Sequence, residues 1–280
     1  MSPRKPSREA TPVFSEYAYY YDILHQDKNY PAEAAFVSRL VKKFAGKSKK
    51  ELRLLDLACG TGRHCVELSR LGYNVEGSDL SKEMINVAQK EIKKRRLKIP
   101  FYNYSFQKAA GIRRRYDVIL SMFASIGYLT TYQEIKLAFS NICMLLNDDG
   151  CFIFDFWNGN ATVRNFSPVR IKKMARGDME VLRVSETRLE QHTQTANLKF
   201  HFLLMKKGMV FKEFEEKHVV RYFFLREMAD LLQANGLEVV FRCPFLHETK
   251  KMTPSDWYVT YVARKIHSAK SSHALNIQLP

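Results

Sequence analysis

The sequence predicts an α/β fold in which a doubly wound, mostly parallel sheet of seven strands is interrupted by an antiparallel β insertion. Two observations lead to this prediction. From residue 52 onward, apolar runs of four to seven residues alternate with stretches of helical periodicity, as in a parallel sheet covered by helices. Between residues 158 and 222 the pattern changes to period two, which is typical of antiparallel strands with one buried face.

The chain is expected to begin with a tail and a helical segment. Residues 1–12 include three prolines and many polar side chains, so we expect this stretch to be disordered. Residues 13–50 have the spacing of two helices, which would lie over the site. Pro31 suits the first turn of the second helix, and Gly46 suits its end. The residues that share one face of the first helix are Tyr17, Tyr20, Tyr21 and Leu24.

Residues 51–157 carry the alternating pattern and are expected to form the core of the sheet. Near-continuous apolar runs fit strands that are buried on both faces. The runs are Leu52–Leu57, Tyr73–Gly77, Ile99–Tyr104, Asp117–Met122 and Cys151–Phe156. The helical stretches between them cover about 62–71, 82–95 and 131–146.

Residues 158–222 predict an insertion of three or more antiparallel strands. Its alternating runs are Glu180–Glu190, Asn197–Met205 and Val210–His218, with a turn candidate at Lys206-Lys207-Gly208. Residues 223–265 are expected to complete the sheet. This region has a helical pattern at 225–235 that ends at Asn235-Gly236, followed by strands at Leu237–Phe241 and Trp257–Ala263. Residues 266–280 are expected to be a second tail.

The composition excludes several classes of protein. Of the 280 residues, 46% are hydrophobic and 26% are charged, which suits a globular protein with a core. No run approaches the ~18 apolar residues of a membrane span, and no apolar run follows the basic N-terminus as in a secretory signal. The five cysteines show no CxxC spacing, so we expect no metal site and no disulfides. We therefore expect buried thiols in a cytoplasmic protein.

The net charge of +16 leaves more than one kind of partner open. Its positive runs are Lys42–Lys50, Lys90–Lys98 and Arg113-Arg114-Arg115. We favour the interpretation that they coat helix ends and loops, because two of the three alternate with apolar helical positions. The charge also leaves two kinds of partner open, an anionic small-molecule acceptor and a nucleic acid. A homodimer is a further possibility, for which the sequence carries no specific signal.

A glycine-containing turn and a spaced acid predict a nucleoside site. The segment Leu54–Gly62 reads as a strand followed by a turn with Gly60 and Gly62, where bare backbone lets a ligand approach closely. Asp79 ends the next strand, where a carboxylate can accept from both hydroxyls of a ribose. Cys65 stands where a dinucleotide site has Gly or Ala, and no Gly-Lys-Ser/Thr follows. A cofactor with a ribose but no phosphate, such as S-adenosylmethionine (SAM), fits better.

These residues resemble the motifs of the class I SAM-dependent methyltransferases, which have a Rossmann-like sheet. The resemblance lies in Leu55–Gly62, Val75–Ser81 and Tyr116–Leu120, and it covers roughly residues 50–160 with the closing elements. It implies that SAM is the cofactor and that 51–157 is the SAM-binding core. The residues it implies for cofactor binding are Tyr21, Tyr30, Ala58, Gly60, Gly62, Asp79, Leu80, Met84 and Met122. The usual adenine-binding acid is absent from Tyr104–Gln107, which leaves Ser105 or Gln107 for that contact.

The acceptor side resembles the amino-sugar N,N-dimethyltransferases. The matching segments are Tyr21–Gln26 with Tyr30, Ser121–Leu129 and Glu215–His218. Those enzymes have a histidine at the position that Tyr128 occupies here. The phenol of a tyrosine has an ordinary pKa of about 10, which makes it a poor base without assistance. His218 has a ring whose ordinary pKa suits a base. We take Tyr128, His218 and Tyr17 as the candidate catalytic residues.

The resemblance implies a small-molecule N- or O-methyltransferase, in which 158–222 forms an acceptor platform or lid. We expect the acceptor to meet Ser121–Tyr128 and Asp155–Asn158, beyond the carboxyl ends of the strands. Two alternatives stay open: an RNA-directed methyltransferase, suggested by the charge, and a non-catalytic SAM-binding regulator. A base-amino methyltransferase is disfavoured because Ser121-Met122-Phe123-Ala124 replaces the Asn/Asp-Pro-Pro-Tyr/Phe that grips a flipped base.

Overall fold

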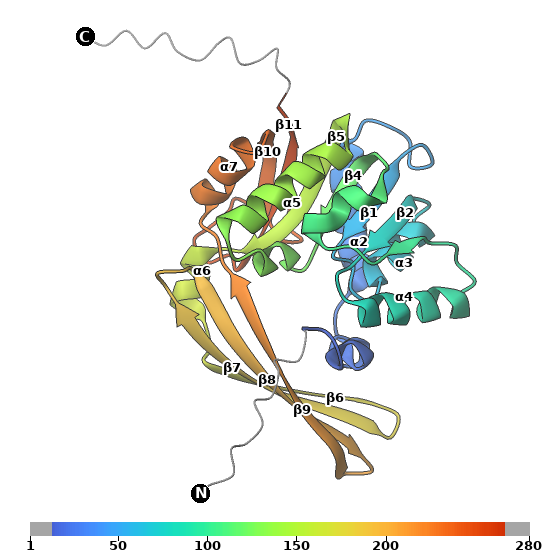
Figure 1. The fold of residues 1–280 in the computed structure, drawn as a ribbon, viewed down its shortest axis with the longest axis vertical. Helices are drawn as coiled ribbons and strands as arrows, with labels where there is room; N and C mark the ends of the chain where they lie inside the picture. Colours follow the sequence, from blue (N-terminus) through green and yellow to red (C-terminus); the bar gives the residue numbers. More distant parts are fainter. Residues whose placement is uncertain (1–12, 267–280) are drawn as a thin grey trace, which may run out of the picture.

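The computed structural model describes residues 13–266 as a layered core from which a long antiparallel ribbon extends (Figure 1). The predicted tails at 1–12 and 266–280 lie outside the described residues, apart from Ile266. Within residues 13–266 no helix is both long and apolar enough to cross a membrane. The five cysteines are free, and all but Cys143 are buried.

The core is a sheet of seven strands in the order β10-β11-β5-β4-β1-β2-β3. The neighbouring strands from β5 through β3 pair in parallel, and β11 is antiparallel to both of its neighbours. This arrangement confirms the predicted doubly wound, mostly parallel sheet. The strands are β1 (Arg53–Leu57), β2 (Asn74–Ser78), β3 (Phe101–Tyr102), β4 (Tyr116–Ser121), β5 (Leu146–Trp157), β10 (Leu237–Pro244) and β11 (Tyr258–Lys265).

Helices cover both faces of this sheet because successive strand residues point to opposite sides. Leu55 and Ile119 pack under α5, α7 and the 3-10 helix η2, whereas Leu54 and Val118 pack under α2, α3 and α4. The helical elements are α2 (Tyr30–Phe44), α3 (Arg63–Arg70), α4 (Lys82–Lys94), η2 (Phe106–Ile112), η3 (Ser125–Tyr128), α5 (Tyr132–Leu145), α6 (Gly159–Asn165) and α7 (Leu225–Gln233). Buried aliphatic side chains of this kind contribute about 1.5–3 kcal/mol each.

The insertion is a four-stranded antiparallel sheet in the order β6-β7-β8-β9. Its strands are β6 (Val169–Arg176), β7 (Met179–Glu190), β8 (Thr195–Lys206) and β9 (Met209–Arg221). The turn predicted at Lys206-Lys207-Gly208 joins β8 to β9, with φ of 50° at Lys207 and 77° at Gly208. The sequence did not reveal β6, because this edge strand is mostly exposed and carries four basic residues among its eight.

The N-terminal region differs from the prediction of two full helices. Only α2 is a long helix; the segment before it contains the 3-10 turn η1 (Tyr17–Tyr19) and one α-helical turn, α1 (Tyr21–Leu24). The polar stretch after α1 breaks the helix, and the Asn29 side chain then caps α2 by accepting from Ala32 N at 3.0 Å. Tyr17 and Leu24 pack instead against Phe202 on the inner face of the insertion.

Candidate functional site

A cavity of about 350 Å³ lies beyond the carboxyl ends of the parallel strands. Its wall combines loops of the core, the N-terminal segment and the inner face of the insertion. Figure 1 shows the short N-terminal helical turns lying between the core and the insertion. The sequence-predicted residues that line it are Tyr17, Tyr21, Tyr30, Ala58, Gly60, Asp79, Leu80, Met84, Gln107, Met122, Tyr128 and His218. The fold therefore brings together side chains from segments up to two hundred residues apart.

The turn after β1 has the backbone that the glycines predicted. Gly60 and Gly62 have φ of 57° and 74°, and Ala58 has φ of 69°. Gly60 lines the cavity, whereas Gly62 does not; it precedes α3, where a Cβ atom would lie 2.8 Å from the Phe101 ring. Gly62 is thus needed for the packing of the turn against Phe101, whereas Gly60 exposes its backbone to a ligand in the cavity.

Asp79 is fixed in the cavity wall in direct contact with that turn. Its two oxygens accept from Gly60 N at 2.8 Å and from Ser81 N at 2.9 Å. Burial raises the pKa of Asp79 to about 6, although these two N–H groups oppose the shift. A carboxylate held in this way keeps lone pairs for the two hydroxyls of a ribose.

The neighbouring wall suits a flat aromatic ring. Asn103 donates to the carbonyls of Asp79 and Leu80 at 2.9 and 2.8 Å, which holds the chain so that Leu80 stays 64% exposed at the rim. Met84 is buried behind it, and Gln107 lines the same cavity. With Asp79 for the ribose, these groups fit a nucleoside such as that of SAM.

Aromatic side chains close the other end of the nucleoside-binding region. Tyr21 and Tyr30 line the cavity, and burial raises the pKa of both phenols, so they stay neutral. Thr61 Oγ1 donates to Asp22 Oδ1 at 2.7 Å, which ties α1 to the glycine turn. The predicted donor-binding residues, with the exception of Gly62, therefore line one cavity.

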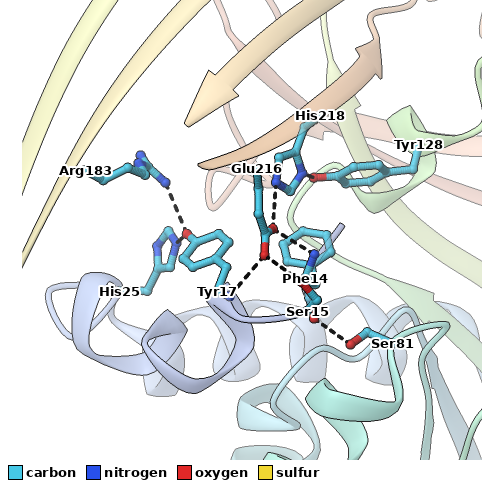
Figure 2. A network of polar contacts seen from close by, with 9 residues as sticks. All are labelled: Phe14, Ser15, Tyr17, His25, Ser81, Tyr128, Arg183, Glu216 and His218. Atoms are coloured by element: carbon cyan, nitrogen blue, oxygen red, sulfur yellow. Dashed lines mark hydrogen bonds and ion pairs between the residues drawn. The ribbon is translucent and has the colours of Figure 1, made fainter. Parts of the chain in front are cut away.

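Tyr128 and His218 are in direct contact, as Figure 2 shows, and a buried glutamate continues the chain. The Tyr128 hydroxyl lies 2.9 Å from His218 Nδ1, and His218 Nε2 lies 3.2 Å from Glu216 Oε2. Glu216 and His218 are each 1% exposed. Because the carboxylate can only accept, it favours the tautomer with hydrogen on Nε2, which leaves Nδ1 to accept from Tyr128.

Glu216 also anchors the N-terminal segment. Its carboxylate accepts from Phe14 N at 2.9 Å, from Tyr17 N at 3.1 Å and from Ser15 Oγ at 3.3 Å. The Phe14 carbonyl in turn accepts from Ser81 Oγ at 2.8 Å. These bonds join the insertion to the core across the cavity (Figure 2).

Tyr17 has its hydroxyl engaged on both sides. Arg183 Nη1 donates to it at 3.1 Å, and His25 Nε2 lies 2.9 Å away. Burial, reinforced by nearby cations, lowers the pKa of His25 to about 3, so the neutral ring accepts the Tyr17 proton. Burial raises the pKa of Tyr17 to about 12, which makes this phenol a fixed hydrogen-bonding group.

Sequence reasoning missed several residues of this site. Glu216, His25 and Arg183 were not singled out, although the period-two spacing of Glu216 and His218 places them on one face of a strand. The expected acceptor contact at Asp155 is corrected by the structure: Asp155 is fully buried, is not among the residues that line the cavity, and accepts through Oδ1 from Ala124 N at 2.8 Å. Trp157, two residues further on, lines the cavity instead.

Comparisons with known proteins agree on one family. Residues 54–150 match the family model described as a methyltransferase domain. The chain is 30% identical over 230 residues to the dTDP-3-amino-3,6-dideoxy-alpha-D-glucopyranose N,N-dimethyltransferase of Streptomyces fradiae, covering 81% of this chain and 85% of that protein. A relative from Geobacillus sp. (strain WCH70) is 32% identical over 143 residues, which are 51% of this chain and 57% of the relative.

Solved structures give the same fold. An S-adenosylmethionine-dependent methyltransferase from Clostridium acetobutylicum ATCC 824 superposes with a TM-score of 0.76 at 20% identity. The match covers 91% of this chain and 100% of that one, so it includes the insertion as well as the core sheet.

Proposed function

The chain belongs to the SAM-dependent methyltransferases, and we propose that it methylates the amino group of a small molecule such as an amino sugar. The observation that carries this proposal is the chain of hydrogen bonds from Tyr128 through His218 to Glu216, which opens onto the cavity at Tyr128. SAM, when bound, supplies an electrophilic methyl group. The relative from Streptomyces fradiae is named for a dTDP-linked amino sugar, which supports an amine as the acceptor.

The proposed donor contacts follow from the geometry of the wall. Asp79 would accept from the ribose hydroxyls, Leu80 and Met84 would flank the adenine, and Gln107 would serve its amino group. Ala58 and Gly60 would contact the methionine part with their backbone. These groups align the donor and exclude water, which is the main requirement of a direct displacement.

The acceptor amine needs a base because it arrives protonated and an ammonium has no lone pair to attack with. Burial raises the pKa of Tyr128, so its phenol does not carry a negative charge on its own. We propose that the ammonium gives a proton to the Tyr128 oxygen while the Tyr128 proton moves to His218 Nδ1. One N–H and one O–H bond break, one O–H and one N–H bond form, and Glu216 stabilises the resulting imidazolium.

Tyr17 would act as a positioning residue for the hydrogen-bonded series Tyr128–His218–Glu216. Its hydroxyl holds Arg183 and His25, and its backbone N–H helps to hold the Glu216 carboxylate. A role in orienting the acceptor side of the cavity fits these contacts better than proton transfer.

The test pairs two acceptors that differ in one atom. The protein is incubated with methyl-labelled SAM and either a dTDP-linked 3-amino sugar or the matching 3-hydroxy sugar, and mass spectrometry follows the label. We expect the amine to gain label and the alcohol to gain none, with Asp79→Ala as the inactive control. Equal labelling of the alcohol, or no labelling of any amine in a broad panel, would exclude the proposal.

A further inference from the structure

The hairpin between β8 and β9 lies at the end of the insertion that points away from α6 and the core sheet (Figure 1). Strand register brings the ends of all four strands of the insertion together there, in the row Arg176, Met179, Lys206 and Met209. We call residues 206–212 the distal tip. The structure describes all of these residues, and none of them lines the cavity. The distal tip therefore lies outside the site described above.

Three consecutive apolar side chains are exposed at the distal tip. Met209 is 72% exposed, and Val210 and Phe211 are each 53% exposed. Met209 and Val210 project from opposite faces of the sheet, because neighbouring residues of a strand alternate between its faces. Phe211 is the extra residue of a bulge, since the residues on either side of it pair with adjacent residues of β8. Apolar surface is thus present on both faces of the distal tip.

The rest of the protein does not cover these side chains. The apolar cluster on the inner face of the insertion contains Tyr17 and Phe202 but ends before the distal tip. Within residues 13–266, no apolar cluster includes Met209, Val210 or Phe211. Single exposed apolar side chains are ordinary, whereas a contiguous group of them is typical of a surface that binds a partner.

Lysines flank the apolar run on both sides. Lys206 and Lys207 precede it, Lys212 follows it, and no acidic residue lies between them. Lys212 pairs with Glu16. Lys206 Nζ lies 3.5 Å from Asp178 Oδ2, but both side chains are mostly exposed, so this pair is weak. In the part of the chain that the structure describes, the Lys207 ammonium forms no ion pair. The distal tip therefore presents positive charge around its apolar side chains.

We propose that the distal tip binds the surface of an anionic lipid bilayer. Its apolar side chains would enter the boundary between headgroups and acyl chains, and its lysines would contact lipid phosphates and carboxylates. A flat protein partner covers one face of a strand, whereas a bilayer surrounds whatever enters it. The exposure of Met209 and Val210 on opposite faces therefore favours a bilayer, and the net charge of +16 favours an anionic one.

Sedimentation with lipid vesicles tests this proposal on the full-length protein. The protein is mixed with vesicles of phosphatidylcholine alone or with vesicles that also contain phosphatidylserine, and the bound fraction is measured. We expect binding to the phosphatidylserine vesicles to be at least about tenfold tighter, and to weaken as added salt screens the lysines. Equal binding to the two kinds of vesicle, or binding to neither, would overturn the proposal.

Variants at exposed positions locate the contact without disturbing the core. Phe211→Ser and Met209→Ser are each expected to weaken vesicle binding by about tenfold, and Lys207→Gln by about fivefold. Ile171→Ser and Arg188→Gln are matched controls outside the distal tip, at side chains that are 69% and 85% exposed, and should bind like the wild type. If the three tip variants also bind like the wild type, the distal tip is not the contact and the proposal is wrong.

A second copy of this chain is the other occupant that the variants distinguish. Sedimentation velocity without lipid gives the oligomeric state of the wild type and of Phe211→Ser. A wild-type dimer that Phe211→Ser converts to a monomer, together with no vesicle binding, would assign the distal tip to self-association and overturn the proposal. An oligomeric state that Phe211→Ser leaves unchanged, with weaker vesicle binding, would support it.

The membrane contact and the methyl transfer are tested independently. Vesicle binding is measured without any methyl acceptor, so the failure of either proposal leaves the other standing. Phe211→Ser should methylate a dissolved acceptor at the wild-type rate, because the distal tip does not line the cavity. A rate reduced by about tenfold or more would mean that the distal tip acts on the cavity, and would count against a separate membrane contact.

Discussion

Asp79 lies in the cavity wall with 9% of its surface exposed, and both of its oxygens already accept a backbone N–H. Burial outweighs these bonds and raises the pKa of Asp79 to about 6, against an ordinary value near 3.8. The Asp79 carboxyl group is therefore charged at neutral pH and becomes neutral in the mildly acidic range. The affinity for SAM should change over the same pH range.

We expect SAM affinity to fall as the pH drops below about 6 and to be constant from about 7 to 8. A carboxylate accepts from both ribose hydroxyls, whereas the protonated acid has lost part of that capacity. Asp79→Ala should weaken SAM binding strongly at pH 7.5 and remove the pH dependence in this window. Calorimetry between pH 5 and 8 measures both effects, and unchanged affinity in Asp79→Ala would contradict the assignment.

Tyr128 and His218 are expected to act on turnover rather than on donor binding. Tyr128→Phe removes the hydroxyl that passes the proton, and His218→Gln removes its acceptor, so each should lower kcat by about 10²–10⁴. SAM affinity should change by less than about threefold. Raising the pH should restore part of the rate, because more of the amine then arrives deprotonated. A wild-type rate in Tyr128→Phe would return this residue to a packing role.

At the scale of elements, the turn between β1 and α3 shows why two glycines two positions apart are not equivalent. Both have positive φ, but only Gly62 faces protein atoms: a Cβ there would lie 2.8 Å from Phe101 and 3.2 Å from Ala88. At Gly60 nothing lies within 4 Å. One glycine is required for packing, and the other leaves open space at the cavity.

Gly62→Ala should therefore destabilise the protein more than Gly60→Ala. Both pay for positive φ, about 1–2 kcal/mol, and Gly62→Ala adds the cost of displacing the Phe101 ring, about 1–3 kcal/mol. Chemical denaturation of the two variants measures the difference. Equal stabilities would mean that the Phe101 ring moves aside freely.

The elements themselves were largely predictable from the sequence. Buried strands such as β4 read as continuous apolar runs, and the hairpin at Lys207-Gly208 carried its own turn signal. The exposed strand β6 and the broken helix before α2 were missed, since their conformation depends on what they pair with and pack against. Residue spacing along one segment does not report such contacts.

The site was predictable only in part for the same reason. The donor residues lie in short motifs next to Gly60 and Asp79, so their spacing along the chain was informative. Glu216 acquires its role from Phe14 and Tyr17, about two hundred residues away. Tyr128 and His218 were named one by one, but their contact across 90 residues could come only from the structure.

At the scale of the whole molecule, the core sheet contains a buried carboxyl group whose pKa is raised, as that of Asp79 is. Asp155 on β5 is fully buried and accepts a single N–H, from Ala124, while its Oδ2 has no partner. Burial raises the pKa of Asp155 to about 6. Its ionisation thus opposes folding: the stability it gives is present below the unfolded value near 4 and is lost as the pH rises through about 6.

Asp155→Asn should gain stability relative to the wild type as the pH rises. The amide cannot ionise, so the difference in the free energy of unfolding should shift in favour of the variant by up to about 3 kcal/mol between pH 4 and pH 8. Denaturation curves at several pH values give this difference. A flat difference across the range would show that Asp155 has an ordinary pKa in the folded protein.

Phe14 connects Ser81 of the core to Glu216 of the insertion, because its carbonyl accepts from Ser81 Oγ and its N–H donates to the Glu216 carboxylate. Val13 and Phe14 also line the same cavity as Gly60 and Asp79. One segment therefore borders the proposed donor region and holds the carboxylate that contacts His218. A displacement of this segment, whatever drives it, would open the cavity wall and withdraw the Phe14 N–H from Glu216 at the same time.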